Sequence, residues 1–320
     1  MTSEIPKIRI VFMGTPQLSA TLLKLLLEHN YNIVGVVTKK DQPVGRKKEL
    51  GINPVKEVAE ANNLPLLQPD KIDGRVISQL RDWKPDLFVV AAYGKILPQE
   101  AISLPGFGCI NFHPSLLPKW RGAAPIQNAL LQGETETGVT LMLMDKGMDT
   151  GDIIKQVTVP IDPKDTSLTL TEKLIKAGGE LLLTTLPLWV GRSLTPMKQD
   201  GSQATLCQLI EREDGHIIWT DDAESIYNRF RALFPWPGVF TYWKKNDELL
   251  RLKILELSFQ KHNTQTTRPL GQVFEIGEKI GVQTTTGIIF LETVQLEGKS
   301  PLPIVEFIRG NESLVGSFLE

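Results

Sequence analysis

Two kinds of hydrophobic pattern alternate through residues 1–190 of the chain. Short apolar runs of strand length lie at 7–14, 32–38, 64–68, 86–93, 108–113, 137–144 and 153–160. Amphipathic segments with a helical period lie at 17–29, 53–62, 72–83, 98–104 and 121–132, and a longer one lies at 167–190. Strands that alternate with helices predict βαβ units, and therefore an α/β fold with a Rossmann-like, doubly wound and mostly parallel sheet.

The run at 86–93, DLFVVAAY, is the most hydrophobic strand candidate in the sequence. A continuous apolar run is typical of a strand covered on both faces, so we expect these residues at the centre of the sheet. The turn after the first strand, Gly14-Thr15-Pro16, lacks the G-x-G-x-x-G pattern of dinucleotide-binding folds. The sequence therefore argues against a nicotinamide cofactor.

The pattern changes after residue 190. Residues 191–205 are polar, contain Gly and Pro, and show no periodicity, which is typical of a linker. One helical segment at 223–232 and five short strand-like runs follow, at 239–244, 249–258, 271–276, 281–285 and 287–295. We therefore predict a first domain over 1–190, a linker over 191–205, and a small OB-like β-barrel domain over 206–320.

Composition excludes several classes of protein. The chain has 320 residues and a net charge of -2, so no bulk basicity points to nucleic acid, and Asp and Glu outnumber Lys and Arg after residue 209. Two cysteines make no disulfide framework, and with four histidines they show no zinc spacing, so we expect no metal and a cytoplasmic location. The opening residues lack the apolar core of a signal peptide, and the apolar run 181–190 is too short to span a bilayer. We expect no membrane partner.

Candidate chemistry gathers where the strand at 108–113 runs into a loop broken by prolines. Side chains two apart on a strand share a face, so Asn111 and His113 should project together while Phe112 points into the packing. Ligands of open α/β sheets bind beyond the carboxyl ends of strands. With a carboxylate from the later loop MDKGMDTGD, an amide donor and an imidazole could carry an acyl transfer. Asp149 is our candidate for that acid, and Asp145 and Asp152 remain alternatives.

A second candidate is the polar loop at 38–52, which carries Lys39, Lys40, Arg46, Lys47 and Lys48. Such a loop is often only a solvated surface segment. However, it leaves the carboxyl end of the second predicted strand, on the same side of the sheet as Asn111 and His113. It could therefore grip a substrate that carries phosphate groups.

The motifs NFHPSLLPKWRGAAPIQ and MDKGMDTGD together resemble the formyltransferases that take their one-carbon unit from 10-formyltetrahydrofolate. A longer match is similar to the family members that formylate initiator methionyl-tRNA; it comprises MGTP, TKKDQPVGRKK, VVAAYGKILP, ETGVTLMLMDKGMDTGDI and FPWPGVF. The resemblance implies folate and initiator methionyl-tRNA as substrates, no metal, and direct attack of the methionine α-amine on the formyl carbon. We also expect a monomer.

The resemblance implies roles for three sets of residues. The catalytic set is Asn111, His113 and Asp149; the folate-binding segment is Ser115, Leu116, Leu117 and Pro118; the residues that grip the tRNA are Arg46, Lys47 and Lys48. In this interpretation Asn111 and a protonated His113 stabilise the oxyanion. Asp149 is expected to favour the imidazolium, because an opposite charge raises the pKa of a histidine.

Some features leave other functions open. Pro114 also fits the related glycinamide ribonucleotide formyltransferases, so another amine, including an amino sugar nucleotide, could be the acceptor. Leu209 and Ile218 stand where the tRNA enzymes usually have a lysine and an aspartate, which bears on how the second domain contacts tRNA. A folate- or RNA-binding module without turnover is the alternative from a different class.

Overall fold

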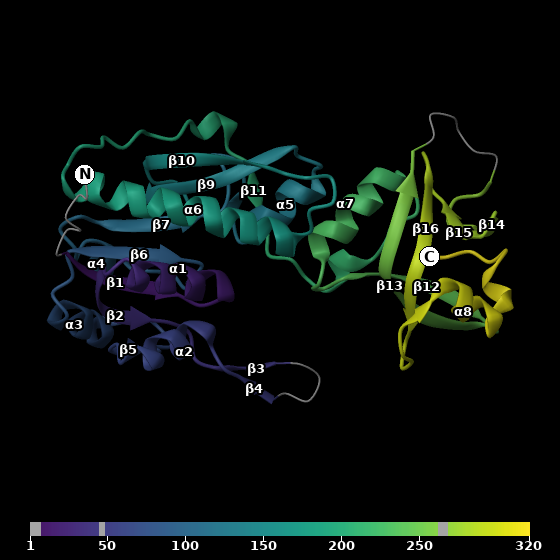
Figure 1. Cartoon of the computed structure of the whole chain (residues 1–320), viewed down its shortest axis with the longest axis horizontal. Helices are drawn as coiled ribbons and strands as arrows, with labels where there is room; N and C mark the ends of the chain where they lie inside the picture. Colours follow the sequence, from purple (N-terminus) through teal and green to yellow (C-terminus); the bar gives the residue numbers. More distant parts are fainter. Residues whose placement is uncertain (1–7, 45–48, 262–267) are drawn as a thin grey trace. The chain divides into compact units, whose positions relative to one another are not determined.

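The computed structural model describes residues 8–44, 49–261 and 268–320 (Figure 1). Contacts between Cα atoms divide the chain into two compact units. The first unit comprises Met1–Pro125, Glu136–Pro160 and Thr171–Cys207, and the second comprises Ile126–Thr135, Ile161–Leu170 and Gln208–Glu320. Two short segments from within residues 1–190 thus group with the second unit.

The first unit is built on a seven-stranded sheet with the strand order β10-β9-β7-β6-β1-β2-β5. Its strands are β1 (Arg9–Gly14), β2 (Asn32–Val37), β5 (Leu66–Leu67), β6 (Leu87–Ala91), β7 (Cys109–His113), β9 (Glu136–Leu143) and β10 (Ile153–Pro160). The strands from β5 to β7 are parallel, whereas β9 is antiparallel to both of its neighbours. The predicted Rossmann-like sheet is confirmed, with β6 at its centre.

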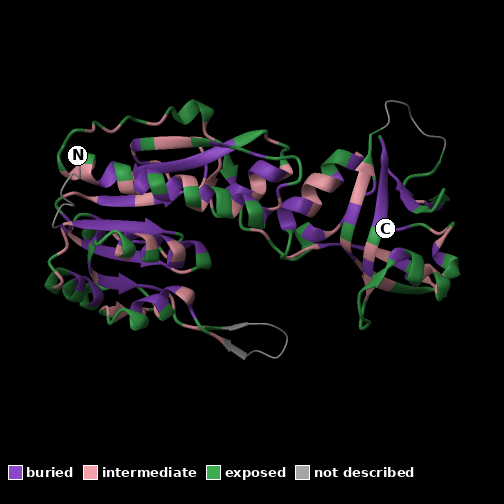
Figure 2. Cartoon of the chain, viewed as in Figure 1, coloured by how far each residue is buried: buried purple, intermediate pink, exposed green. Residues whose placement is uncertain are grey.

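Helices cover both faces of this sheet. They are α1 (Gln17–Glu28), α2 (Pro54–Ala61), α3 (Gly74–Asp82), α4 (Gln99–Ile102) and α6 (Ser167–Val190). Glycines in α6 allow close packing: a Cβ at Gly178 would lie 2.5 Å from the Phe112 ring, and one at Gly179 would lie 2.6 Å from Leu25 of α1. On the other face, α3 and α4 pack against Val11 and other strand residues. The inner strands are consequently buried on both sides (Figure 2).

One predicted helix begins later than expected. We predicted a helix over 121–132, but Arg121–Gly122 forms a short strand, β8, and α5 spans Pro125–Leu131. Gly122 has φ 121°, which is incompatible with a right-handed helix. Pro125 then occupies the first position of α5, where its missing N–H costs nothing.

The predicted loop at 38–52 contains regular structure at both of its ends. Gln42–Val44 (β3) and Glu49–Gly51 (β4) pair as an antiparallel hairpin. The hairpin follows β2, whose carboxyl end lies at the same edge of the sheet as that of β7 because the intervening strands are parallel. The predicted relation between this segment and the Asn111 strand is therefore confirmed.

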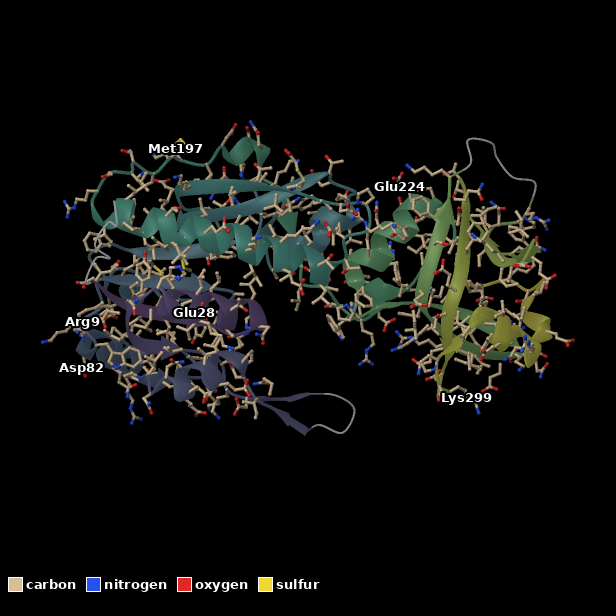
Figure 3. All side chains as sticks on the ribbon, viewed as in Figure 1. Arg9, Glu28, Asp82, Met197, Glu224 and Lys299 are labelled. Carbon is tan, nitrogen blue, oxygen red and sulfur yellow. The ribbon has the colours of Figure 1, made fainter. Side chains whose placement is uncertain are left out.

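The predicted linker runs along the first unit. Met197, labelled in Figure 3, forms an antiparallel bridge with Ile153 at the start of β10. A short 3-10 helix follows at Gly201–Gln203, and Leu206–Cys207 (β11) then pairs in parallel with β8. These contacts fix the segment to the loop that follows β7.

The second unit is a curled antiparallel sheet with the order β12-β13-β16-β15-β14, and β17 pairs with β16. The strands are β12 (Val239–Lys245), β13 (Glu248–Gln260), β14 (Val273–Ile276), β15 (Lys279–Gln283), β16 (Ile288–Leu296) and β17 (Leu302–Pro303). All five predicted strands are present, and helices α7 (Ala223–Leu233) and α8 (Ile304–Arg309) accompany them.

The two edges of this sheet are joined by the last residues of the chain. Leu319 bridges Trp243 of the edge strand β12, and Phe318 bridges Gln272, which immediately precedes the other edge strand, β14. Edge strands present unpaired backbone groups, and closure of a sheet into a barrel satisfies them. The predicted OB-like barrel is thus confirmed. None of the described helices is both long and apolar enough to cross a membrane.

Candidate active site

Strand β7 places the amide and the imidazole on one face, as predicted. Phe112 points to the opposite face, where α6 covers it, and only 2% of its surface is exposed. Asn111 and His113 flank it in the strand and project to the other side. Both are held by a rigid parallel sheet, which suits groups that must keep a fixed geometry.

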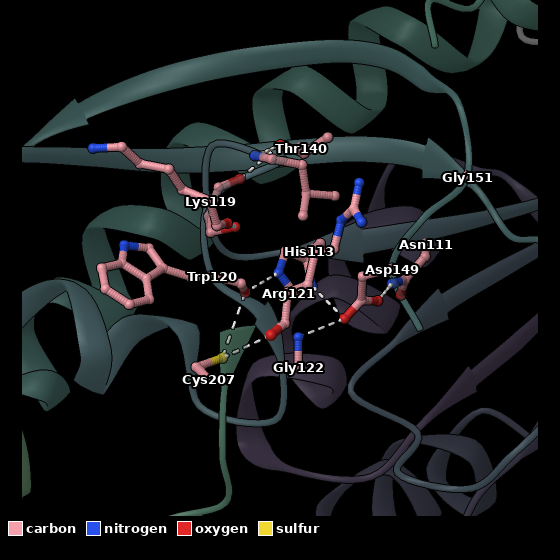
Figure 4. A network of polar contacts seen from close by, with 12 residues as sticks. Asn111, His113, Lys119, Trp120, Arg121, Gly122, Thr140, Asp149, Gly151 and Cys207 are labelled. Atoms are coloured by element: carbon pink, nitrogen blue, oxygen red, sulfur yellow. Dashed lines mark hydrogen bonds and ion pairs between the residues drawn. The ribbon is translucent and has the colours of Figure 1, made fainter. Parts of the chain in front are cut away.

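Asp149 joins this pair (Figure 4). The Asn111 Nδ2 donates to Asp149 Oδ1 at 3.3 Å, and Asp149 Oδ2 lies 3.7 Å from His113 Nδ1. The backbone N–H of Gly122 donates to the same Oδ2 at 2.9 Å. Asp145 instead accepts hydrogen bonds from the turn around it, including one of 2.7 Å from Thr150 Oγ1. The structure therefore brings Asp149, rather than Asp145, to the predicted pair.

Asp149 reaches the pair although its loop starts at the opposite end of β7 from His113. Strand β9 is antiparallel to β7, so Leu143 pairs with Ile110 while Thr140 pairs with His113. The loop after β9 must turn back along β7 to bring the carboxylate to His113. A close approach makes this possible: a Cβ on Gly151 would lie 1.7 Å from the Leu143 carbonyl oxygen, so only glycine fits.

The histidine is buried and has a hydrogen-bond acceptor at each ring nitrogen. Its Nε2 donates to the Trp120 carbonyl oxygen at 3.0 Å, and its Nδ1 faces Asp149. Burial lowers the pKa of His113 more than the Asp149 carboxylate and the Trp120 carbonyl raise it. Asp149 thus favours the imidazolium, as expected, but its effect is too small to keep the net pKa of His113 at its ordinary value. Desolvation of the cation outweighs the nearby negative charge.

The predicted folate-binding segment forms a rigid wall beside His113. Ser115 is fully buried and its hydroxyl donates to the Lys119 carbonyl at 2.6 Å, while Leu117 packs inside against Met142 and Ile153. Leu116 and Pro118 are half-exposed. Two backbone groups of the segment are bound inside the protein, because Thr140 Oγ1 donates to the Ser115 carbonyl at 2.6 Å and accepts from the Leu117 N–H at 3.1 Å.

Several residues of the site were assigned no role from the sequence. Gly122 gives Asp149 a backbone donor, and a Cβ there would lie 2.2 Å from the Cys207 carbonyl oxygen. Trp120 contributes only its carbonyl oxygen to His113. Gln199 of the linker donates to the carbonyl oxygens of the Asp149 loop. Backbone groups and linker glutamines have no distinctive pattern in a sequence.

The predicted tRNA-gripping residues Arg46, Lys47 and Lys48 lie outside the described residues. Within the described part of the same segment, Lys40 pairs with Asp70 at 2.6 Å. Across residues 8–44, 49–261 and 268–320, no three His, Cys, Asp or Glu side chains are grouped so that they could hold a metal ion.

Known proteins match the chain over nearly its whole length. Residues 7–186 match the formyl transferase family, and residues 209–312 match the formyl transferase C-terminal domain. Methionyl-tRNA formyltransferase of Caldicellulosiruptor saccharolyticus is 43% identical over 314 residues, which cover 97% of this chain and 99% of that protein. The chain belongs to the methionyl-tRNA formyltransferase family. A second family member, from Geobacillus sp. (strain WCH70), is 50% identical over 240 residues, or 75% of this chain and 76% of that protein.

Solved structures share the family's fold at lower sequence identity. An N-formyltransferase from Helicobacter canadensis, solved with folinic acid and dTDP-3-aminofucose, has a TM-score of 0.65 at 21% identity over 89% of this chain and 98% of its own. HypX from Aquifex aeolicus, solved with tetrahydrofolic acid, has a TM-score of 0.63 at 17% identity over 94% of this chain and 47% of its own. These likenesses establish the fold.

Proposed function

We propose that this protein transfers the formyl group of 10-formyltetrahydrofolate to the α-amine of methionine on initiator methionyl-tRNA. One observation carries the proposal: Asn111, His113 and Asp149 converge in a chain whose relatives of nearly equal length are methionyl-tRNA formyltransferases. The folate donor is supported by the family match and by two neighbours of the same fold that were solved with folate compounds.

In the proposed mechanism Asn111 binds the formyl oxygen. A carboxamide nitrogen carries two N–H donors, and one of those of Asn111 is directed to Asp149. The second can donate to the formyl oxygen as the amine attacks and negative charge builds there. Donors aimed at a developing oxyanion are worth about 2.7–4 kcal/mol of barrier reduction each.

Asp149 and His113 handle the proton in this mechanism. The neutral amine forms the new C–N bond, the bond from the formyl carbon to folate N10 breaks, and one amine proton must move to N10. Asp149 accepts that proton, and the neutral His113 can hold it at Nδ1, 3.7 Å away. Once charged, the imidazolium keeps the hydrogen bond from Nε2 to the Trp120 carbonyl, and the Asp149 carboxylate, 3.7 Å from Nδ1, balances its charge. In the resting protein the neutral His113 is thus ready to accept a proton. The mechanism requires no metal.

Binding of the two substrates falls to different parts of the protein in this proposal. Leu116 and Pro118 offer an apolar face beside His113 for the flat pterin of the folate, with Ser115 and Leu117 as its inner support. Arg46, with Lys47 and Lys48, grips phosphates near the acceptor end of the tRNA. The barrel of the second unit assists, although Leu209 and Ile218 place exposed apolar side chains in its leading segment. We place the reaction in the cytoplasm and expect a monomer.

The test is formyl transfer from 10-formyltetrahydrofolate to purified initiator tRNA charged with methionine. Uncharged initiator tRNA and methionyl elongator tRNA are the controls, and glycinamide ribonucleotide and a dTDP-linked amino sugar are the competing acceptors. We expect formylation of the charged initiator alone. Transfer to either small acceptor at a higher kcat/KM than to the tRNA would overturn the proposed acceptor. Absence of any transfer with folate bound would indicate a binding module.

A further inference from the structure

We propose that Gln199, in the segment between the two domains, is a positioning residue that holds Asp149 in the active site. This inference rests on the proposed formyl transfer for its kinetic consequences. The Gln199 Nε2 donates to the carbonyl oxygen of Asp149 at 2.8 Å and to that of Gly151 at 2.7 Å. The two carbonyls belong to the peptide bonds 149–150 and 151–152, so a single amide group holds two peptide units of the loop.

The Asp149 backbone requires such support because it adopts an uncommon conformation. Its φ is 54°, in the left-handed region that non-glycine residues rarely occupy. A residue held there costs about 1–3 kcal/mol and persists only where the surroundings enforce it. The carboxylate contacts Asn111, His113 and Gly122, but these are contacts of the side chain. The contacts from Gln199 act on the main chain.

Gln199 is itself held in place from the other side. The Arg121 Nε and Nη2 donate to Gln199 Oε1 at 3.1 and 2.8 Å. Arg121 belongs to β8, which pairs with β11 just beyond the linker, and it precedes Gly122, the backbone donor to Asp149. The amide of Gln199 therefore connects the loop that carries Asp149 with the segment whose Gly122 N–H donates to the Asp149 carboxylate. A backbone shift in either segment would move Asp149 relative to His113.

The hydrogen bonds of Gln199 can be made by a glutamine but not by a glutamate, which is its closest replacement in shape. A carboxamide offers two N–H donors and an acceptor at one position. A glutamate there would keep, and strengthen, the contact with Arg121, but it would place oxygen against two carbonyl oxygens. Gln199→Glu should therefore damage the Asp149 loop as Gln199→Ala does, even though its bond to Arg121 survives. Gln203 is a matched control, because it is exposed in the same linker and, among the residues that the structure describes, its Nε2 donates only to Asp200, at 3.0 Å.

The experiment compares Gln199→Ala, Gln199→Glu and Gln203→Ala with the unchanged protein. A 1 Å misplacement of a catalytic group lowers a rate by about 10²-fold, so we expect kcat to fall about 10- to 100-fold in both Gln199 variants. KM for folate should stay within about twofold, because the wall at 115–118 is anchored by Thr140 rather than by Gln199. Gln203→Ala should match the unchanged protein.

A second readout needs no substrate. Asp149 raises the pKa of His113, so its departure should lower the pKa of that imidazole further, as measured by NMR titration of the free protein. A kcat within twofold of the unchanged protein, or an unchanged His113 titration in both folded variants, would overturn the role of Gln199. Failure of the unchanged protein to transfer formyl groups would overturn the proposed function alone, because the titration still tests the contact. If Gln199→Ala does not fold, Gln199→Glu supplies both readouts.

Discussion

Replacement by valine should change the stability of the protein in opposite directions at two threonines of β9. Thr140 is fully buried, and its hydroxyl donates to the Ser115 carbonyl at 2.6 Å while accepting from the Leu117 N–H at 3.1 Å and from Gln156 Nε2 at 2.8 Å. Thr137 is also buried, but its hydroxyl has no hydrogen-bond partner among the residues that the structure describes. Valine has nearly the shape of threonine, so each substitution isolates the hydroxyl.

The expected energies follow from what each hydroxyl satisfies. Thr140→Val leaves the Ser115 carbonyl and the Leu117 N–H without that partner, while Gln156 keeps its second contact, to the Leu117 carbonyl at 2.9 Å. Each buried polar group left unsatisfied costs about 1–3 kcal/mol, so the free energy of unfolding should fall by about 2–5 kcal/mol. Thr137→Val removes a buried hydroxyl whose desolvation is not offset by a hydrogen bond among the described residues. It should therefore stabilise the first domain by about 1 kcal/mol.

Calorimetry of both variants measures these changes, read on the transition of the first domain because two domains need not unfold together. At about 2–4 °C per kcal/mol for a domain of this size, the two melting temperatures should move apart by roughly 10 °C. Hydrogen exchange adds a local readout: the Leu117 amide should lose protection in Thr140→Val and keep it in Thr137→Val. KM for folate should rise only in Thr140→Val, because the wall at 115–118 loosens.

Either of two results would refute this explanation of the two threonines. Equal melting temperatures for the two variants would show that the hydroxyl contacts of Thr140 are not what holds the segment. A destabilised Thr137→Val would show that its hydroxyl has a partner that the geometry does not reveal. The first result would remove the basis for treating residues 115–118 as a preformed folate wall.

Three further outcomes are expected. Because burial lowers the pKa of His113 below its ordinary value of 6.5, the unfolded chain binds a proton more readily than the folded one. The contribution of His113 to stability is then complete above about pH 6.5 and is lost as the pH falls toward the lower folded pKa; denaturant midpoints should show this slope flattened in His113→Gln, and an identical slope would contradict the shift. Asn111→Ala should lower kcat by about 10²–10³-fold with folate affinity nearly unchanged; a loss under tenfold would remove Asn111 from oxyanion stabilisation. Arg46→Ala should reduce kcat/KM for methionyl-tRNA far more than for a methionine ester, and should lower the salt dependence of tRNA binding by about one phosphate contact; equal losses on both acceptors would argue against a tRNA-gripping role.

The part of the site predicted from sequence is the part set by strand periodicity. Asn111 and His113 share a face because side chains alternate along any strand, and the apolar run around them marked that strand clearly. The same reasoning placed Phe112 in the core and 86–93 at the centre of the sheet. These features depend on local pattern and burial, both of which are written in the sequence.

The features that sequence could not predict depend on chain direction and backbone contacts. Nothing in the apolar alternation of β9 shows that it runs antiparallel to β7, so the path of the Asp149 loop back along β7 was not foreseeable. The polar composition of 191–205 fits a solvated linker as well as a segment that supports Asp149 through Gln199. The protonation of His113 depended on a balance between burial and Asp149, and burial could be weighed only in three dimensions.

The way in which the barrel of the second unit closes has a consequence for the synthesis of the protein. The pairs Trp243 with Leu319 and Gln272 with Phe318 join both edges of the sheet through residues that are synthesised after all of its strands. The first domain has its complete sheet and the Asp149 network before residues 318 and 319 emerge from the ribosome, whereas the barrel keeps two open edges until then. Unpaired edges are templates for intermolecular pairing. The second domain is therefore the part of a nascent chain that most needs protection from aggregation.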